Sequence, residues 1–254
     1  MYLMAFDTST ENLSVGIYVT DTKKKGSVRC RVRHSAYSGP PGPKRVLETV
    51  AETATASFLR HSEILMPTIE KMLRRARITP DSLEMIAVGL GPGSFTGLRI
   101  GLAVAKTMAW TLKIALVGVD SMEAVARAAR YCDGRVAVLA DAKRSNCYAA
   151  LYEMKNGSCR SLLAPSLLSL GEFLEKIDQP TVFLGSGSAY YADRILESKI
   201  GCMAALIEGK PSLPRARWIA EAALERAVRG KVGTRGQWEP LYLYRRDCNV
   251  TPAK

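Results

Sequence analysis

The chain has 254 residues, of which 47% are hydrophobic and 24% charged, a composition typical of a soluble globular protein with a large core. Lys and Arg number 36 against 24 Asp and Glu, and the resulting net charge of +12 favours phosphate-rich partners such as RNA without requiring one. Apolar runs end well short of the roughly 20 residues of a membrane span, and the start lacks the basic region of a signal peptide. We therefore expect a soluble, cytoplasmic protein with no membrane association.

Metal and nucleophile chemistry find little support in the residue inventory. The two histidines, His34 and His61, are far apart, and no HExxH pattern is present, so we predict no metal site. No serine lies in a GxSxG elbow, and we predict no catalytic residue. The cysteines lack any CxxC pair and indicate free thiols in a reducing compartment; they are Cys30, Cys132, Cys147, Cys159, Cys202 and Cys248.

The chain begins with a predicted β-hairpin. Residues 2–6 form an apolar strand that ends at Asp7, and residues 13–19 alternate as a second strand. An Asp followed by hydroxyl residues at this place holds magnesium and phosphate in actin-like ATPases and sugar kinases. The same residue types are also ordinary turn formers, and the hairpin alone favours that second explanation.

Residues 20–60 have a different composition. Lys23–Lys25 open a basic stretch, and residues 38–43 are rich in Pro and Gly. Residues 46–59 are expected to form a short helix, weakened by their hydroxyl residues. The segment is a candidate for RNA binding, although a run of charge is more often a solvated surface.

Two helices follow with distinct faces. In the first, residues 62–76, the apolar residues Leu65, Ile69 and Met72 share one face. The second follows a strand at 85–89 and a glycine loop at 90–97, and it leads to a strand at 114–119. Small residues recur along it at every fourth position: Gly97, Gly101, Ala105 and Ala109. This stripe indicates close approach of another backbone, either the chain's own or that of another subunit.

The glycine loop invites a phosphate-binding interpretation, because glycines let backbone N–H groups approach an anion at a helix N-terminus. However, no Lys-Ser or Lys-Thr pair follows the last glycine, and the dinucleotide-binding spacing is absent. A turn that serves packing remains the alternative.

The second half repeats the plan of the first. A strand at 136–140 ends at Asp141, a polar turn follows, and a second strand covers 147–152. A later strand at 181–184 leads into Gly185 and Gly187, and a helix is expected over 215–229. We predict two lobes of one α/β plan, residues 1–120 and 121–254, with a cleft between them.

Four stretches resemble the TsaB (YeaZ) family of bacterial proteins: residues 61–67, 91–101, 117–124 and 240–245. The resemblance implies an actin-like (ASKHA, ribonuclease H-like) α/β fold. It also implies a non-catalytic partner of TsaD in the threonylcarbamoylation of adenosine 37 (t6A) in tRNAs that read ANN codons. TsaE would be a further partner, tRNA would be met through the complex, and the isolated chain would form a homodimer.

Two sets of residues carry these expectations. The first is a degenerate nucleotide cleft with at most weak binding of ATP or ADP with Mg, made by Asp7, Thr8, Ser9, Asp141, Gly185 and Gly187. The second is a subunit interface, made by His61, Leu65, Ile69, Met72, Gly97, Gly101 and Ala105. On this model an Arg at Gly101 blocks pairing and leaves the fold intact. The alternatives are an actin-like ATPase or small-molecule kinase, and an independent tRNA-binding module.

Overall fold

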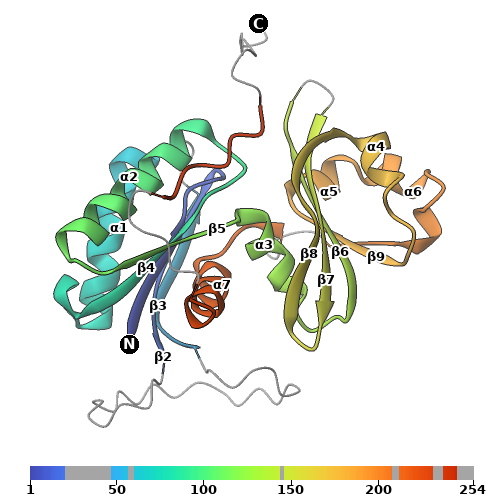
Figure 1. Cartoon of the computed structure of the whole chain (residues 1–254). Coiled ribbons are helices and arrows are strands. Elements are labelled where there is room, and N and C mark those ends of the chain that lie inside the picture. The colour runs from blue at the N-terminus through green and yellow to red at the C-terminus, as the bar shows by residue number, and fades with distance from the viewer. Residues whose placement is uncertain (21–46, 57–59, 144–145, 208–211, 231–236, 245–254) are drawn as a thin grey trace, which may run out of the picture.

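The computed structural model describes residues 1–20, 47–56, 60–143, 146–207, 212–230 and 237–244 (Figure 1). Several predicted features lie outside these residues, namely Lys23–Lys25, the 38–43 stretch, His34, Cys30, Cys248 and residue 245 at the end of the 240–245 stretch. The described cysteines are free thiols. Among the described helices, none is long and apolar enough to cross a membrane.

The first sheet has five strands in the order β3-β2-β1-β4-β5. Its strands are β1 (Tyr2–Asp7), β2 (Asn12–Thr20), β3 (Leu47–Ala56), β4 (Leu83–Gly89) and β5 (Ala115–Val119). β1 and β2 form the predicted antiparallel hairpin, while β4 and β5 run parallel to β1. The helix α2 (Phe95–Thr111) joins β4 to β5 as the predicted crossover, and α1 (His61–Ala76) precedes the short 3₁₀ turn η1 (Pro80–Ser82).

The expectation of a helix over residues 46–59 is wrong. Residues 47–56 form β3, an edge strand that pairs antiparallel with β2 over its full length. The segment alternates β-branched residues such as Thr49, Thr53 and Thr55, which fit a pleated, half-buried surface better than a helix. The threonine-rich segment therefore forms a strand, because β2 offers it a hydrogen-bonding partner that the local sequence does not reveal.

The second sheet repeats the first, with the order β10-β9-β6-β7-β8. Its strands are β6 (Gly134–Asp141), β7 (Asn146–Lys155), β8 (Ser158–Ser169), β9 (Thr181–Leu184) and β10 (Ala204–Leu206). Short helices accompany it: α4 (Leu170–Leu174), α5 (Ser186–Tyr190), α6 (Ala192–Leu196) and the 3₁₀ turn η3 (Gly201–Met203). Three antiparallel strands followed by two parallel ones in both lobes confirm the duplicated α/β plan.

The two faces of the first sheet are covered by different parts of the chain. α1 and α2 bury Leu65, Ile69 and Leu102 against one face. The other face is covered by α7 (Ala216–Val228), which buries Ile219 and Ala223 against β1, β4 and β5. The division at residue 120 therefore separates the two sheets, but α7 returns from the second half of the sequence to the first lobe (Figure 1).

The lobes meet through α3 (Ser121–Ala126) and its 3₁₀ extension η2 (Arg127–Ala129). Met122 and Val125 pack on the second sheet, while Ala124 packs with α7 in the core of the first lobe. Sheet, α7, α3 and second sheet thus follow one another across the molecule (Figure 1).

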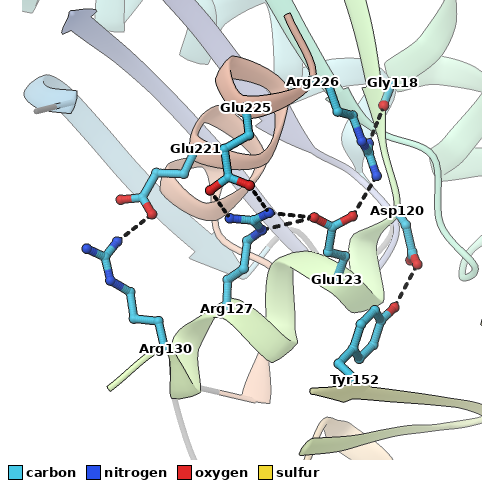
Figure 2. Close-up of polar contacts among 9 residues, drawn as sticks. All are labelled: Gly118, Asp120, Glu123, Arg127, Arg130, Tyr152, Glu221, Glu225 and Arg226. Atoms are coloured by element: carbon cyan, nitrogen blue, oxygen red, sulfur yellow. Dashed lines mark hydrogen bonds and ion pairs between the residues drawn. The ribbon is translucent and has the colours of Figure 1, made fainter. Parts of the chain in front are cut away.

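An ion network fixes α3 to α7 (Figure 2). Arg127, only 4% exposed, donates from Nε and Nη2 to Glu123 Oε1 at 3.0 and 2.8 Å. The same guanidinium donates to both carboxylate oxygens of Glu225 at 3.0 and 2.9 Å. Arg226 of α7 bonds Glu123 Oε2 at 2.5 Å and the Gly118 carbonyl at 2.6 Å. Charge-assisted pairs of this kind, with several partners each, hold a fixed geometry better than single exposed pairs do.

Asp120 adds a second polar link between the lobes. One carboxylate oxygen caps α3 by accepting from the Met122 N–H at 2.7 Å, and the other accepts from the Tyr152 hydroxyl at 2.7 Å. Tyr152 lies on β7, so the contact joins the end of β5 to the second sheet (Figure 2). Burial raises the pKa of Asp120 to about 6, although both hydrogen bonds act to lower it.

Replacing Arg127 by Met tests the ion network. The change leaves Glu123 and Glu225 without their shared cation, and we expect a loss of about 2–3 kcal/mol in the free energy of unfolding, somewhat less than for a fully enclosed pair because both carboxylates keep some solvent contact. Urea unfolding measures this. The control is Arg160→Met, which breaks an exposed pair with Glu153 and should cost less than about 1 kcal/mol. Equal losses in the two variants would contradict a special role for Arg127.

Asp120 predicts a specific pH dependence. Its pKa is near 6 in the folded chain and 3.8 in the unfolded one, so the folded state binds more protons between these values and this group makes stability fall as pH rises. Asp120→Asn keeps the cap and removes the titration. Its free energy of unfolding relative to the parent chain should rise by about 2–3 kcal/mol from pH 4 to pH 7. An exposed carboxylate, changed in Asp178→Asn, provides the control, and a difference that does not vary with pH would contradict the prediction.

Candidate functional site

The candidate site consists of the two hairpin turns that end the first strand of each lobe. β1 ends at Asp7, which pairs in register with Ser14, and β6 ends at Asp141, which pairs with Cys147. Because both hairpins hold the same place in their sheets, the fold brings the two carboxylates to equivalent positions, as the repeated pattern predicts.

Asp7 is completely buried, and both of its carboxylate oxygens have hydroxyl partners. Oδ1 accepts from the backbone N–H and the hydroxyl of Ser9 at 2.8 and 2.6 Å, and Oδ2 accepts from the Ser121 hydroxyl at 2.6 Å. Burial raises the pKa of Asp7, while these hydrogen bonds act to lower it. Ser121 also accepts from the Gly91 N–H at 3.0 Å, so one serine links the first strand, the glycine loop and α3.

Glycines of β4 and α2 lie so close to the β1–β2 turn that a side chain would not fit at their positions. A Cβ on Gly89 would lie 1.8 Å from Asp7 Oδ2, and one on Gly97 would lie 2.2 Å from the Thr8 carbonyl oxygen. A Cβ on Gly101 would lie 2.2 Å from the Thr8 hydroxyl oxygen. That hydroxyl donates to the Gly97 carbonyl at 2.8 Å. The glycine loop and the start of α2 therefore clasp the β1–β2 turn, and the packing explanation of the loop accounts for its glycines.

The corresponding turn of the second lobe is more open. Asp141 is partly exposed and pairs with Lys143, whose ammonium lies 2.7 Å from Oδ2. Partial burial raises the pKa of Asp141, but the bonds and charge of Lys143 outweigh it and lower the net value. Gly185, with φ of 102°, and Gly187 pack against β6, where a Cβ on Gly185 would meet the Leu139 carbonyl oxygen at 2.0 Å.

A nucleotide with magnesium fits these side chains poorly. Asp7, Thr8 and Ser9 are each at most 2% exposed, and the carboxylate oxygens of Asp7 are engaged by hydroxyls of the chain itself. Lys143 already neutralises Asp141. Within the described residues, no group of three or more His, Cys, Asp or Glu side chains is arranged to hold a metal ion. We therefore assign no chemical step to a nucleotide or metal on this chain.

The residues predicted to form a subunit interface face the chain's own interior, which corrects their assignment. Leu65, Ile69 and Met72 belong to the core beneath α1, with at most 2% exposure. Gly97 and Gly101 face the β1–β2 turn, and Ala105 is fully buried against the sheet. The four-residue spacing correctly indicated close backbone approach, but spacing cannot say whose backbone approaches.

His61 also lies inside the first lobe. It opens α1 and is 2% exposed, close enough to Asp7 and to the Thr10 carbonyl for both to act on its titration. Burial lowers the pKa of His61, and these two neighbours act to raise it. This agrees with a structural role at the helix start.

The outward faces of α1 and α2 carry exposed apolar residues that the sequence patterns did not single out. Met66 is 50% exposed, Phe95 54% and Trp110 70%. Figure 1 shows α1 and α2 side by side on the outer side of the first sheet, away from the second lobe. The helical period places Met66 outside the apolar face that Leu65, Ile69 and Met72 form. An apolar residue outside that face is the sequence feature that could have indicated an exposed contact surface.

A two-lobed α/β body, in which each lobe repeats three antiparallel and two parallel strands and ends its first strand in an Asp, defines an actin-like protein. The family model described as TsaD, tRNA N6-adenosine threonylcarbamoyltransferase, matches residues 53–234. The tRNA threonylcarbamoyladenosine biosynthesis protein TsaB of Bacillus subtilis is 31% identical over 77% of this chain and 75% of its own length. The Escherichia coli protein of the same name is 28% identical over 72% of this chain and 80% of its own. The chain belongs to the TsaB (YeaZ) family.

Solved structures agree on the fold. YeaZ from Pseudomonas aeruginosa superposes with a TM-score of 0.70 at 24% identity, over 95% of this chain and 99% of that one. A second structure, described as an uncharacterized protein with similarity to peptidase YEAZ from the same organism, gives a TM-score of 0.71 at 23% identity over 96% and 99%. Both matches extend across the two lobes, so the whole described body shares this architecture.

The clasp around the turn predicts the cost of adding a methyl group. Gly97→Ala would place a Cβ against the Thr8 carbonyl, and we expect a loss of about 1–3 kcal/mol in the free energy of unfolding despite the better helix propensity of Ala. Gly171→Ala is the matched control, because Gly171 also lies in the first turn of a helix and a Cβ there meets nothing within 4 Å. Urea unfolding should show it neutral or slightly stabilised. A neutral Gly97→Ala would contradict the clasp.

Proposed function

We propose that this chain is a non-catalytic subunit required for t6A formation at adenosine 37 of tRNAs that read ANN codons, and that it acts by pairing with the catalytic subunit TsaD. Its family relatives are named for threonylcarbamoyladenosine biosynthesis, which supports the pathway. One structural observation supports the absence of catalysis in particular: Asp7, the carboxylate that an actin-like nucleotide cleft would use, is enclosed by Ser9 and Ser121.

The outward faces of α1 and α2 are the proposed docking surface. Met66, Phe95 and Trp110 offer apolar and aromatic area there, and such residues are enriched at the energetic centres of interfaces. On α1, Glu70 and Arg74 form an exposed ion pair one and two turns beyond Met66. The buried faces of the same helices are rigidly packed on the sheet, so the surface is held in place before a partner binds.

In this proposal, α1 and α2 pack against the matching helices of TsaD around a local two-fold axis. TsaE joins the complex, and tRNA is bound through the assembly. Without TsaD, the same surface pairs two copies of this chain, because an isologous contact needs only one self-complementary patch.

Charge placed on the surface tests the proposal. Met66→Glu and Trp110→Glu should each weaken co-purification with TsaD at least about tenfold, since an unpaired carboxylate would be desolvated in the interface. Formation of t6A, measured by mass spectrometry of tRNA nucleosides in a reconstituted reaction, should fall in parallel. Urea unfolding should remain close to that of the parent chain, because both side chains are exposed.

Leu196→Glu is the control for this experiment. Leu196 lies on α6 of the second lobe and is as exposed as Met66, at 51%. It should leave pairing and t6A formation unchanged. If Met66→Glu and Trp110→Glu behave as Leu196→Glu does, the docking surface lies elsewhere. A parent chain that neither binds TsaD nor supports t6A formation would contradict the proposed function itself.

A further inference from the structure

Residues 237–244, here called the strap, follow α7 in the sequence and run along the first lobe past α2 (Figure 1). Their end contacts the second lobe at the β6–β7 hairpin. The strap has no helix or strand of its own, so its course is set by contacts with the two lobes. Those contacts are hydrogen bonds and ring contacts made at the start, the middle and the end of the strap.

The start of the strap is anchored on β5. The Trp238 indole N–H donates to the Leu116 carbonyl at 2.9 Å, and the ring covers Gly118, where a Cβ would lie 2.6 Å from it. Trp238 also packs against the apolar cores on both faces of the first sheet. This residue fixes where the strap begins.

The middle of the strap is anchored on the glycine loop and α2. The Leu241 N–H donates to the Leu90 carbonyl at 2.8 Å. The Tyr242 ring lies 5.0 Å from that of Phe95, and its hydroxyl accepts from Arg99 Nε at 2.9 Å. The Arg99 guanidinium in turn lies 3.8 Å from the centre of the Phe95 ring, so the three side chains form one cluster.

The end of the strap reaches the second lobe. The Tyr244 hydroxyl donates to the Ala142 carbonyl, with the Lys143 carbonyl 3.4 Å away. Its ring meets that of Tyr148 edge-on at 6.2 Å. Both contacts are in the hairpin that Asp141 opens, the counterpart of the Asp7 turn.

We propose that the strap is an interlobe latch: anchored on the first lobe by Trp238, Leu241 and Tyr242, it holds the second lobe through Tyr244. α3 and the Arg127 network form one junction between the lobes, and Tyr244 forms another at the side of the two hairpin turns. A body connected at one place can pivot, whereas a second connection fixes the angle between its parts. In many two-lobed proteins a ligand bound between the lobes fixes the angle between them. In this chain the strap would fix that angle without a ligand.

Hydrogen exchange of the full-length chain tests the latch. Tyr244→Phe removes the hydroxyl and keeps the ring. Amides of residues 146–148, in the β6–β7 hairpin, should exchange about 2- to 10-fold faster, the range expected from losing one hydrogen bond. The matched control is Tyr131→Phe, which removes the hydroxyl of an exposed tyrosine just before β6, at the end of that strand opposite to the hairpin turn, and should leave these amides unchanged.

Tyr242→Ala separates a latch from a local contact. Tyr242 touches α2 of the first lobe, yet a latch would transmit its loss and speed exchange at residues 146–148 as well. Peptides of α1 and α7 should remain unchanged in every variant, which shows that the lobes stay folded. If Tyr244→Phe leaves the hairpin as in the parent chain, or if Tyr242→Ala affects the first lobe alone, the latch is overturned.

Discussion

The arrangement of the two lobes depends on the buried guanidinium of Arg127. It lies in η2, between the carboxylate of Glu123 on α3 and that of Glu225 on α7, and α7 packs on the first sheet. A buried ion pair gives little net stability once desolvation is counted, but its geometry is demanding, because either charge left alone is costly. The network therefore chiefly fixes the position of α3 relative to α7. Because α7 packs on the first sheet and α3 on the second, it also fixes the orientation of one sheet relative to the other.

A second constraint is the closed turn at Asp7. The carboxylate is held by two hydroxyls, and glycines of the loop and of α2 surround the turn where any side chain would collide with it. The elements that would open onto a ligand in an actin-like cleft are used here to pack the chain against itself. The outward faces of α1 and α2 carry exposed apolar side chains instead. For this reason the proposed function places the partner on these helices and gives the Asp7 turn no catalytic part.

The net charge of the whole chain differs from that of its described residues. The chain has a net charge of +12, yet 15 of its 36 Lys and Arg and 3 of its 24 Asp and Glu lie outside the described residues, which leaves 21 of each within them. The described body is therefore balanced, and many of its charges are paired across elements, as Arg130 with Glu221 and Arg215 with Glu52 show. Electrostatic attraction to RNA, one of the alternatives that the composition suggested, would depend on the remaining residues.

The sequence by itself determined the strand order within each hairpin, the crossover through α2, the duplication and the family, because periodicity, turn residues and a long glycine motif are local signals. It also indicated that something approaches α2 closely. Tertiary structure decided that this is the Thr8 turn, that residues 47–56 complete a sheet, and that α7 and the strap return to the first lobe. Each of these is a contact between segments distant in sequence: Ser121 on Asp7, Glu225 on Arg127, Tyr244 on Ala142. Spacing along one segment cannot specify its partner in another, because that choice is made by the packing of the whole chain.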